Sequence, residues 1–245
     1  MPESPLPGGF VNAVVRVGDT VRRPASARTR FVGDLLRLLD ARGWSGAPRY
    51  LGVDDEGREV LSHLEGIAAW EPRQPAAVSS DESLATVARL VREFRELTAG
   101  TPLAGDQEVV CHNDLSPKNT VYQLSGGELR PAAFIDWDLA ASGARIHDIA
   151  HVCWQYLGLG PSVTDVEEAA RRLRLIVDSY KLADRQRLVS TILWWQDRCW
   201  RGIESQAVAG DVAMTRLRDA GAVRHVRADY QWVSDHQSAL ERSVR

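Results

Sequence analysis

Two carboxylates and an amide follow two short apolar runs in the middle of the chain. The first run, residues 109–111, is followed by Asp114 and, five residues later, by Asn119. The second run, residues 132–135, is followed directly by Asp136. Carboxylate and amide oxygens are hard ligands that suit Mg²⁺, and a carboxylate can also accept the proton of a hydroxyl group. These residue types predict a site for a divalent cation and a reacting hydroxyl.

The segments between these residues suggest how they are brought together. A proline lies between Asp114 and Asn119, so a rigid loop and not a helix must hold both side chains. A Ser-Gly-Gly turn at residues 125–127 separates the two apolar runs. We expect the runs to be neighbours in one hairpin-like unit, with the polar residues converging at one end of two strands.

Together the motifs resemble the signature of the aminoglycoside phosphotransferase and choline kinase-like families, which are related to the eukaryotic protein kinases. The matching segments are HNDLSPKN (residues 112–119), IDWD (135–138) and DIA (148–150). The GGFVN segment (8–12) also resembles the glycine-containing nucleotide loop of these families. The resemblance covers most of residues 8–155.

This resemblance implies a two-lobed, protein-kinase-like α+β fold. Residues 1–65 would form a small antiparallel-sheet lobe that binds nucleotide. Residues 66–245 would form a larger, mostly helical lobe with the catalytic and substrate-binding residues. The implied reaction is the Mg²⁺-dependent transfer of the γ-phosphoryl group of ATP or GTP to a hydroxyl of a small molecule, such as an aminoglycoside, another antibiotic, an amino alcohol or a sugar.

The resemblance also implies a role for each residue of the central motifs. Asp114 would be the catalytic base or would orient the acceptor hydroxyl. Asn119 and Asp136 would hold Mg²⁺ against the nucleotide phosphates. His112 would brace the loop, and Asp148 would anchor its backbone.

Nucleotide contacts are expected in the N-terminal lobe, where the family usually carries a lysine on the third strand, paired with a glutamate on the next helix. Here Arg22 takes the strand position, and Arg23 is the alternative if the register shifts by one residue. The following helix has Asp34 but no glutamate. Asp138 is left as either a substrate residue or a local cap. The expected nucleotide-binding residues are Gly8, Gly9, Asn12, Arg22, Ser62, His63 and Leu64.

The hydrophobic pattern predicts the elements around these residues. Strands are predicted at 10–17, 20–23, 49–53 and 59–64, with a helix at 27–41 and a linker at 66–80. A second helix is predicted at 81–99, with Ser80 as its N-cap and Gly100 after its end. Further helices are predicted at 145–157, 163–181, 184–208 and 211–243. Five tryptophans after residue 150 are expected to be core residues or, alternatively, to stack on a cationic ligand: Trp154, Trp194, Trp195, Trp200 and Trp232.

The composition is that of an ordinary globular protein, with 44% hydrophobic and 26% charged residues and a net charge of −3. No large basic surface is indicated, so neither a nucleic acid nor a membrane is expected as a partner. Cys111, Cys153 and Cys199 are far apart, which argues against a disulfide framework or a zinc site. The chain start lacks the features of a signal peptide, and a cytoplasmic protein is expected.

The second motif also fits another class of enzyme. The Asp136-Trp137-Asp138 segment also resembles the nucleophile motif of haloacid-dehalogenase phosphatases, although Ala140 stands where a threonine or valine is expected. The eleven residues between Asp136 and Asp148 are too few for a protein-kinase activation segment, which favours a small-molecule acceptor.

Two further alternatives come from different classes. His147-Asp148, with His112, His151 and Asp165, could form an HD-type metal hydrolase, although His112 follows a strand where that fold needs a helix. The arginine on the third strand and the missing helix glutamate also suit a catalytically weak pseudokinase that binds nucleotide or a partner.

Overall fold

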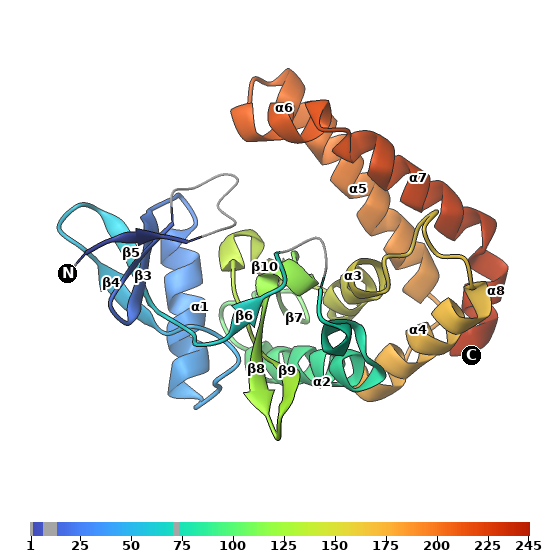
Figure 1. Ribbon diagram of the computed structural model, residues 1–245, viewed down its shortest axis with the longest axis horizontal. Coiled ribbons are helices and arrows are strands. Elements are labelled where there is room, and N and C mark those ends of the chain that lie inside the picture. Colours follow the sequence, from blue (N-terminus) through green and yellow to red (C-terminus); the bar gives the residue numbers. More distant parts are fainter. Residues whose placement is uncertain (1, 7–13, 71–73) are drawn as a thin grey trace. The chain divides into compact units, whose positions relative to one another are not determined.

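The computed structural model describes residues 2–6, 14–70 and 74–245 (Figure 1). Its backbone contacts divide the chain into two compact units, Met1–Asp148 and Ile149–Arg245. This boundary differs from the lobe boundary at residue 65, which stays a prediction. All the central motif residues up to Asp148 belong to the first unit.

An antiparallel sheet of five strands opens the first unit, in the order β1-β2-β3-β5-β4 (Figure 1). In the register of β3 and β5, Arg22 lies opposite Val60 and Arg23 lies opposite Glu59. Because successive side chains of a strand point to opposite faces, the two arginines face different surroundings. The strands are β1 (Ser4–Pro5), β2 (Val15–Val17), β3 (Thr20–Pro24), β4 (Tyr50–Val53) and β5 (Arg58–Ser62).

One helix, α1 (Thr29–Ala41), packs against β4 of this sheet. It buries an apolar stripe, and each fully buried side chain of this kind contributes about 1.5–3 kcal/mol through removal of apolar surface from water. The helix ends where Gly43 adopts a left-handed conformation with φ of 70°. The buried side chains of the stripe are Val32, Leu35, Leu36 and Leu39.

The apolar run at 109–111 pairs with a different strand from the one that the sequence suggests. The run at 109–111, β7 (Val109–Cys111), pairs with β10 (Ala141–Gly143) and not with the run at 132–135. The latter belongs to β9 (Glu128–Phe134), which pairs with β8 (Thr120–Ser125). The expected pairing was wrong because a two-residue Gly126-Gly127 turn joins the segments directly beside it.

The segment expected as a linker contains short elements of its own. β6 (Ile67–Ala68) pairs with β8, and the 3-10 helix η1 (Ala76–Ser79) follows. Gly66 has φ of 134°, and a Cβ on it would lie 2.5 Å from the Tyr122 carbonyl oxygen, so a glycine is required there. This close approach allows β6 to extend the β8–β9 hairpin into a three-stranded sheet.

A capped helix, α2 (Asp81–Thr98), packs against β7 and β9. As predicted, Ser80 is its N-cap and accepts a hydrogen bond from the Ser83 N–H at 3.2 Å. α3 (Arg145–Leu157) then leads from the first unit into the second.

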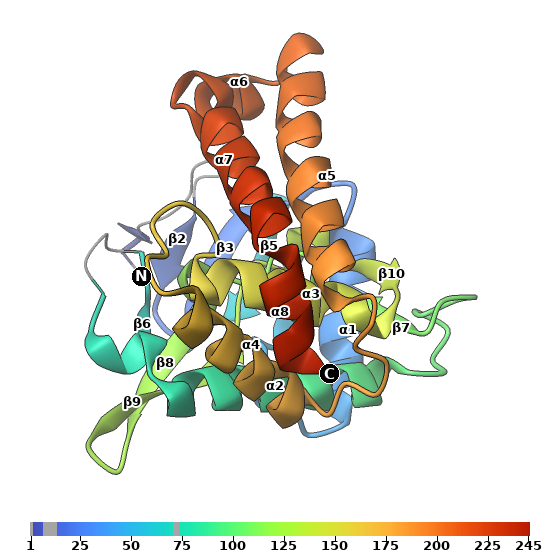
Figure 2. The same ribbon diagram turned by 90° about the vertical axis from the view of Figure 1, so that its right-hand side faces the viewer.

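The second unit is helical, and α5 packs along α7 in it while α4 packs along α8 (Figure 2). A single helix was expected at 211–243, but the chain forms three, because Gly221 adopts φ of 90° and the chain breaks again at His236. Trp154, Trp195 and Trp232 are buried core residues. The helices are α4 (Val166–Tyr180), α5 (Leu188–Val208), α6 (Val212–Asp219), α7 (Ala222–Asp235) and α8 (Gln237–Val244). Across the described residues, no helix combines the length and apolar character needed to cross a bilayer.

Candidate active site

The β8–β9 hairpin brings the ends of two motifs together. Thr120 at the start of β8 pairs with Phe134 at the end of β9. One residue further out, the Ile135 N–H donates to the Asn119 carbonyl at 2.9 Å. Residues that precede β8 and residues that follow β9 therefore lie at the same end of the hairpin, and Asn119 and Asp136 come together there.

Asn119 links the end of the loop to the Asp114 carboxylate. Its Nδ2 donates to Oδ2 of Asp114 at 2.7 Å and to the Asp114 backbone carbonyl at 2.8 Å. The Asn119 side chain is fully buried, and no group in the described part of the chain hydrogen-bonds to its Oδ1. Leaving such an oxygen unsatisfied costs about 1–3 kcal/mol. A bound cation is one partner that would satisfy this oxygen.

Asp136 follows the hairpin in a conformation that is unusual for aspartate. Its φ and ψ are 63° and 64°, in the left-handed region, at a cost of order 1 kcal/mol. Its side chain is 47% exposed, so the carboxylate is accessible. Strain of this kind commonly occurs where a side chain must be aimed at a ligand.

The donor set of Asn119 and Asp136 fits Mg²⁺. One buried amide oxygen without a partner and one accessible carboxylate are hard oxygen donors, and Mg²⁺ commonly takes its remaining ligands from phosphates and water. No three His, Cys, Asp or Glu side chains of the described residues group as a metal site.

Burial raises the pKa of each central carboxyl group. Burial raises the pKa of Asp114, although Lys118 and the Asn119 hydrogen bond oppose this shift. Partial burial raises the pKa of Asp136, and the negative charge of Asp114 raises it further. The positive charges of Arg23 and Lys118 oppose this shift. A cation bound between these carboxylates would relieve their repulsion. Lys118 was not anticipated from the sequence; its position between Asp114 and Asn119 was the available signal.

The loop that carries Asp114 is held by hydrogen bonds to a buried carboxylate. Asp148 accepts the His112 N–H at 2.8 Å and the Asn113 N–H at 2.9 Å. Burial raises the pKa of Asp148 to about 6, against the lowering effect of these two hydrogen bonds. The His112 ring packs on Trp137 with centroids 4.4 Å apart, and its Nε2 lies 3.1 Å from the Ile135 carbonyl. His112 and Asp148 are therefore parts of the loop's scaffold.

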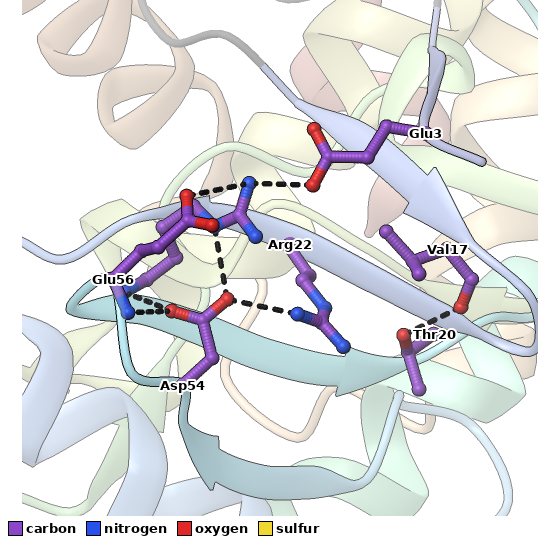
Figure 3. A network of polar contacts seen from close by, with 7 residues as sticks. Glu3, Val17, Thr20, Arg22, Asp54 and Glu56 are labelled. Atoms are coloured by element: carbon purple, nitrogen blue, oxygen red, sulfur yellow. Dashed lines mark hydrogen bonds and ion pairs between the residues drawn. The ribbon is translucent and has the colours of Figure 1, made fainter. Parts of the chain in front are cut away.

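The structure brings Arg23, and not Arg22, to the aspartates. Arg22 points to the other face of β3, where its Nη1 lies 3.1 Å from Asp54, as Figure 3 shows. Hydrogen bonding, chiefly from the Arg58 N–H, lowers the pKa of Asp54 to about 2, so Arg22 has an ionised partner. The expected position was shifted by one residue, and in a strand this reverses the direction of the side chain.

Arg23 has partners that the sequence did not reveal. Its Nε contacts Glu59 at 2.6 Å, and its Nη2 contacts Asp138 at 2.7 Å. Its Nη1 lies 3.8 Å from Asp136. The glutamate that pairs with Arg23 is therefore on the neighbouring strand, directly opposite Arg23, and not on the following helix. The alternation of side chains along β5 was the signal for Glu59, and Asp138 forms an ion pair instead of a cap.

Some of the remaining residues expected to contact nucleotide lie outside the described part of the chain. Gly8, Gly9 and Asn12 fall outside the described residues. Ser62 is the last residue of β5, His63 and Leu64 follow it, and all three are partly exposed. Ser62 Oγ accepts the N–H of Arg49 at 2.8 Å, and the His63 N–H donates to the Asp19 carbonyl at 2.8 Å. Nucleotide binding by Ser62, His63 and Leu64 stays a prediction.

Comparison with solved structures identifies the fold as protein-kinase-like, two-lobed and α+β. A choline/ethanolamine kinase family protein from Mesorhizobium loti matches with a TM-score of 0.58 at 16% identity, over 95% of this chain and 92% of that one. The GDP complex of aminoglycoside 2′-phosphotransferase-IIIa matches with a TM-score of 0.61 at 15% identity, over 100% and 92%. An ethanolamine kinase from Plasmodium vivax matches with a TM-score of 0.64 at 11% identity, over 100% and 83%.

Residues 47–187 match the model of the phosphotransferase enzyme family, and the chain belongs to this family. A curated relative is the trifolitoxin immunity protein of Rhizobium leguminosarum bv. trifolii, which is 31% identical over 209 residues. The alignment covers 74% of this chain and 75% of the relative.

Proposed function

We propose that this protein is a Mg²⁺-dependent phosphotransferase that moves the γ-phosphoryl group of ATP or GTP to a hydroxyl of a small molecule. The observation that carries the proposal is the arrangement of Asp114 and Asn119. One atom of the Asn119 amide holds the Asp114 carboxylate, and its other atom is buried without a described partner. Membership of the phosphotransferase enzyme family supports the same reaction.

In the proposed mechanism Asp114 orients the acceptor hydroxyl and accepts its proton at Oδ1 or Oδ2. The raised pKa of Asp114 suits this role, because a more basic carboxylate takes up a proton more readily. Asn119 and Asp136 would hold the metal, and a bound Mg²⁺ supplies neutralisation of charge on the phosphate oxygens. Since phosphoryl transfer needs little covalent chemistry from the protein, positioning and electrostatics supply most of the rate.

Cellular location and donor complete the proposal. Cys111 and Cys153 are buried thiols in the structure, which suits the reducing cytoplasm where nucleoside triphosphates are made. A GDP complex among the structural neighbours is a reason to test GTP beside ATP as donor.

The test is a panel of acceptors with ATP or GTP and Mg²⁺. Aminoglycosides, other antibiotics, amino alcohols and sugars are assayed for nucleoside diphosphate release and for a mass increase of one phosphoryl group. The Asp114→Ala variant serves as the background control. A phosphorylated acceptor with the wild type alone supports the proposal. Nucleotide binding without transfer to any acceptor would instead favour the nucleotide-binding pseudokinase.

The named relative favours a second, more specific proposal. Because that relative is a toxin immunity protein, we propose a toxin or antibiotic with a free hydroxyl as the acceptor class. Expression of the wild type in sensitive cells should protect them against such a compound, and the Asp114→Ala variant should not. Equal protection by both proteins would mean that immunity does not depend on phosphoryl transfer.

A further inference from the structure

The three carboxylates around Arg23 differ in how deeply they are buried. Glu59 has a side chain that is 3% exposed and contacts Nε of the guanidinium at 2.6 Å. Asp138 is 32% exposed and contacts Nη2 at 2.7 Å. Asp136 is 47% exposed and lies 3.8 Å from Nη1. One edge of the guanidinium therefore faces a buried partner, and the other edge faces accessible ones.

The buried edge is fixed. Separating Glu59 from Arg23 would leave a charge without compensation inside the protein, which is strongly unfavourable. Glu59 already has one oxygen, Oε1, that is buried without a partner among the described residues, so it has no second group to turn to. Glu59 thus holds Arg23 in place whatever happens at the opposite edge.

The Nη edge of Arg23, whose carboxylate partners are partly exposed, can change partners. A guanidinium binds carboxylate and phosphate oxygens with the same planar donor geometry, so Asp138 takes a position that suits a phosphate oxygen. Moving Asp138 away exposes it to water, and the buried Arg23 guanidinium, 9% exposed, keeps the charge of Glu59 beside it.

We propose that Asp138 competes with the phosphates of the nucleotide for Arg23 and thereby sets the affinity of the site for polyphosphate anions. The proposal rests on the proposed function for the identity of the anion. In the free protein Asp138 pairs with the Nη edge of Arg23, and a polyphosphate takes this place when it binds. The charge of Asp138 then weakens anion binding through Arg23.

The opposite role gives the opposite result. If Asp138 only positioned Arg23 for the ligand, its removal would weaken anion binding. If its charge acted only through space, its removal would strengthen binding equally with and without Arg23. A double-mutant cycle separates these three cases.

The experiment measures the dissociation constants of tripolyphosphate without metal, and of ATP and GTP with Mg²⁺, by titration calorimetry at one pH. The proteins are the wild type, Asp138→Asn, Arg23→Met and the double variant. We expect Asp138→Asn to tighten tripolyphosphate binding about tenfold or more, in line with the coupling of close charge pairs. In the Arg23→Met background the same change should tighten binding less than about twofold. Circular dichroism checks that each variant is folded.

A matched control removes an aspartate that pairs with an arginine on the surface. Asp34 lies 3.0 Å from Arg37 on α1, and both are about half exposed. Asp34→Asn should leave the affinity for tripolyphosphate unchanged. The same gain from Asp34→Asn as from Asp138→Asn would overturn the proposal.

The proposal also fails if Asp138→Asn weakens binding, leaves it unchanged, or strengthens it equally in both backgrounds. Failure of both the wild type and Asp138→Asn to bind any of the probes overturns it as well. The acceptor panel judges the proposed function separately. Arg23-dependent tightening without turnover would leave this inference standing and reject the phosphotransferase activity, whereas turnover without tightening would do the reverse.

Discussion

The loop that carries Asp114 and the strand that carries Arg23 are held in place by different kinds of interaction. The loop is fixed by backbone N–H groups that donate to Asp148, and by a ring that packs on Trp137. Arg23 is fixed by charge, through carboxylates on β5 and on the segment after β9. Asp148 lies 36 residues from His112, and Glu59 lies 36 residues from Arg23. The separation in sequence is therefore the same, but Asp148 belongs to a recognisable motif, whereas the partners of Arg23 depend on strand register.

The largest effect is expected where the loop meets the chemistry. Asp114→Asn should lower kcat about 10²–10⁴-fold, the range that general base catalysis contributes. The Asn119 side chain keeps a carbonyl acceptor there, so unfolding by urea should change little. The comparison of kcat with the urea midpoint checks this. A variant that loses stability and activity together would place Asp114 in the scaffold with Asp148.

The strand region should respond in stability. Glu59→Gln leaves the Arg23 guanidinium without its buried ionic partner, and breaking a buried pair costs about 3–5 kcal/mol of folding free energy. Glu56→Gln, which changes an exposed glutamate of the same hairpin (71% exposed), is the matched control. Urea unfolding of the two variants measures the difference. Equal stability of both would show that burial does not anchor Arg23.

These two regions also differ in how well the sequence predicted them. The loop could be predicted because Asp114, Asn119 and Asp136 belong to short motifs at the ends of strands. Arg23 was predicted only as the alternative to Arg22, because a shift of one residue reverses a side chain, and its partner Glu59 belongs to no recognisable motif. The pairing of β9 was also missed. β9 pairs with β8, the segment on the other side of the Gly126-Gly127 turn, and not with β7, the apolar run that the sequence suggested. The break at Gly221 was missed for a different reason: the positive φ that separates α6 from α7 is known only from the structure.

A smaller effect is expected from pH on the loop's anchor. The pKa of Asp148 is about 6 in the folded protein against 3.8 for an ordinary aspartate. Between these values the folded state keeps a proton that the unfolded state has released, so this group lowers stability as the pH rises from about 4 to about 6. The full penalty, about 3 kcal/mol, applies above pH 6 and disappears below pH 4.

Asp148→Asn tests this assignment, because the amide does not titrate. Stability relative to the wild type is measured by urea unfolding at several pH values from 4 to 7. Other buried carboxyl groups titrate in both proteins and cancel in the difference. The stability cost of the variant should be largest near pH 4 and should shrink toward pH 7. A difference that stays constant with pH would mean that Asp148 is ionised throughout.

The smallest effect on ligand binding is expected from the arginine beside Arg23. Arg22 pairs with Asp54 on the other face of β3, so Arg22→Met should leave the affinity for tripolyphosphate unchanged, while Arg23→Met should weaken it about tenfold or more, as expected for loss of a charge-assisted contact. The two variants remove the same side chain from adjacent positions, so the direction of the side chain is the main difference between them.

Weaker binding in Arg22→Met than in Arg23→Met would reverse the register of β3 against β5 and, with it, the ion pairs of Arg23. Equal affinity in both would mean that neither arginine contacts the anion.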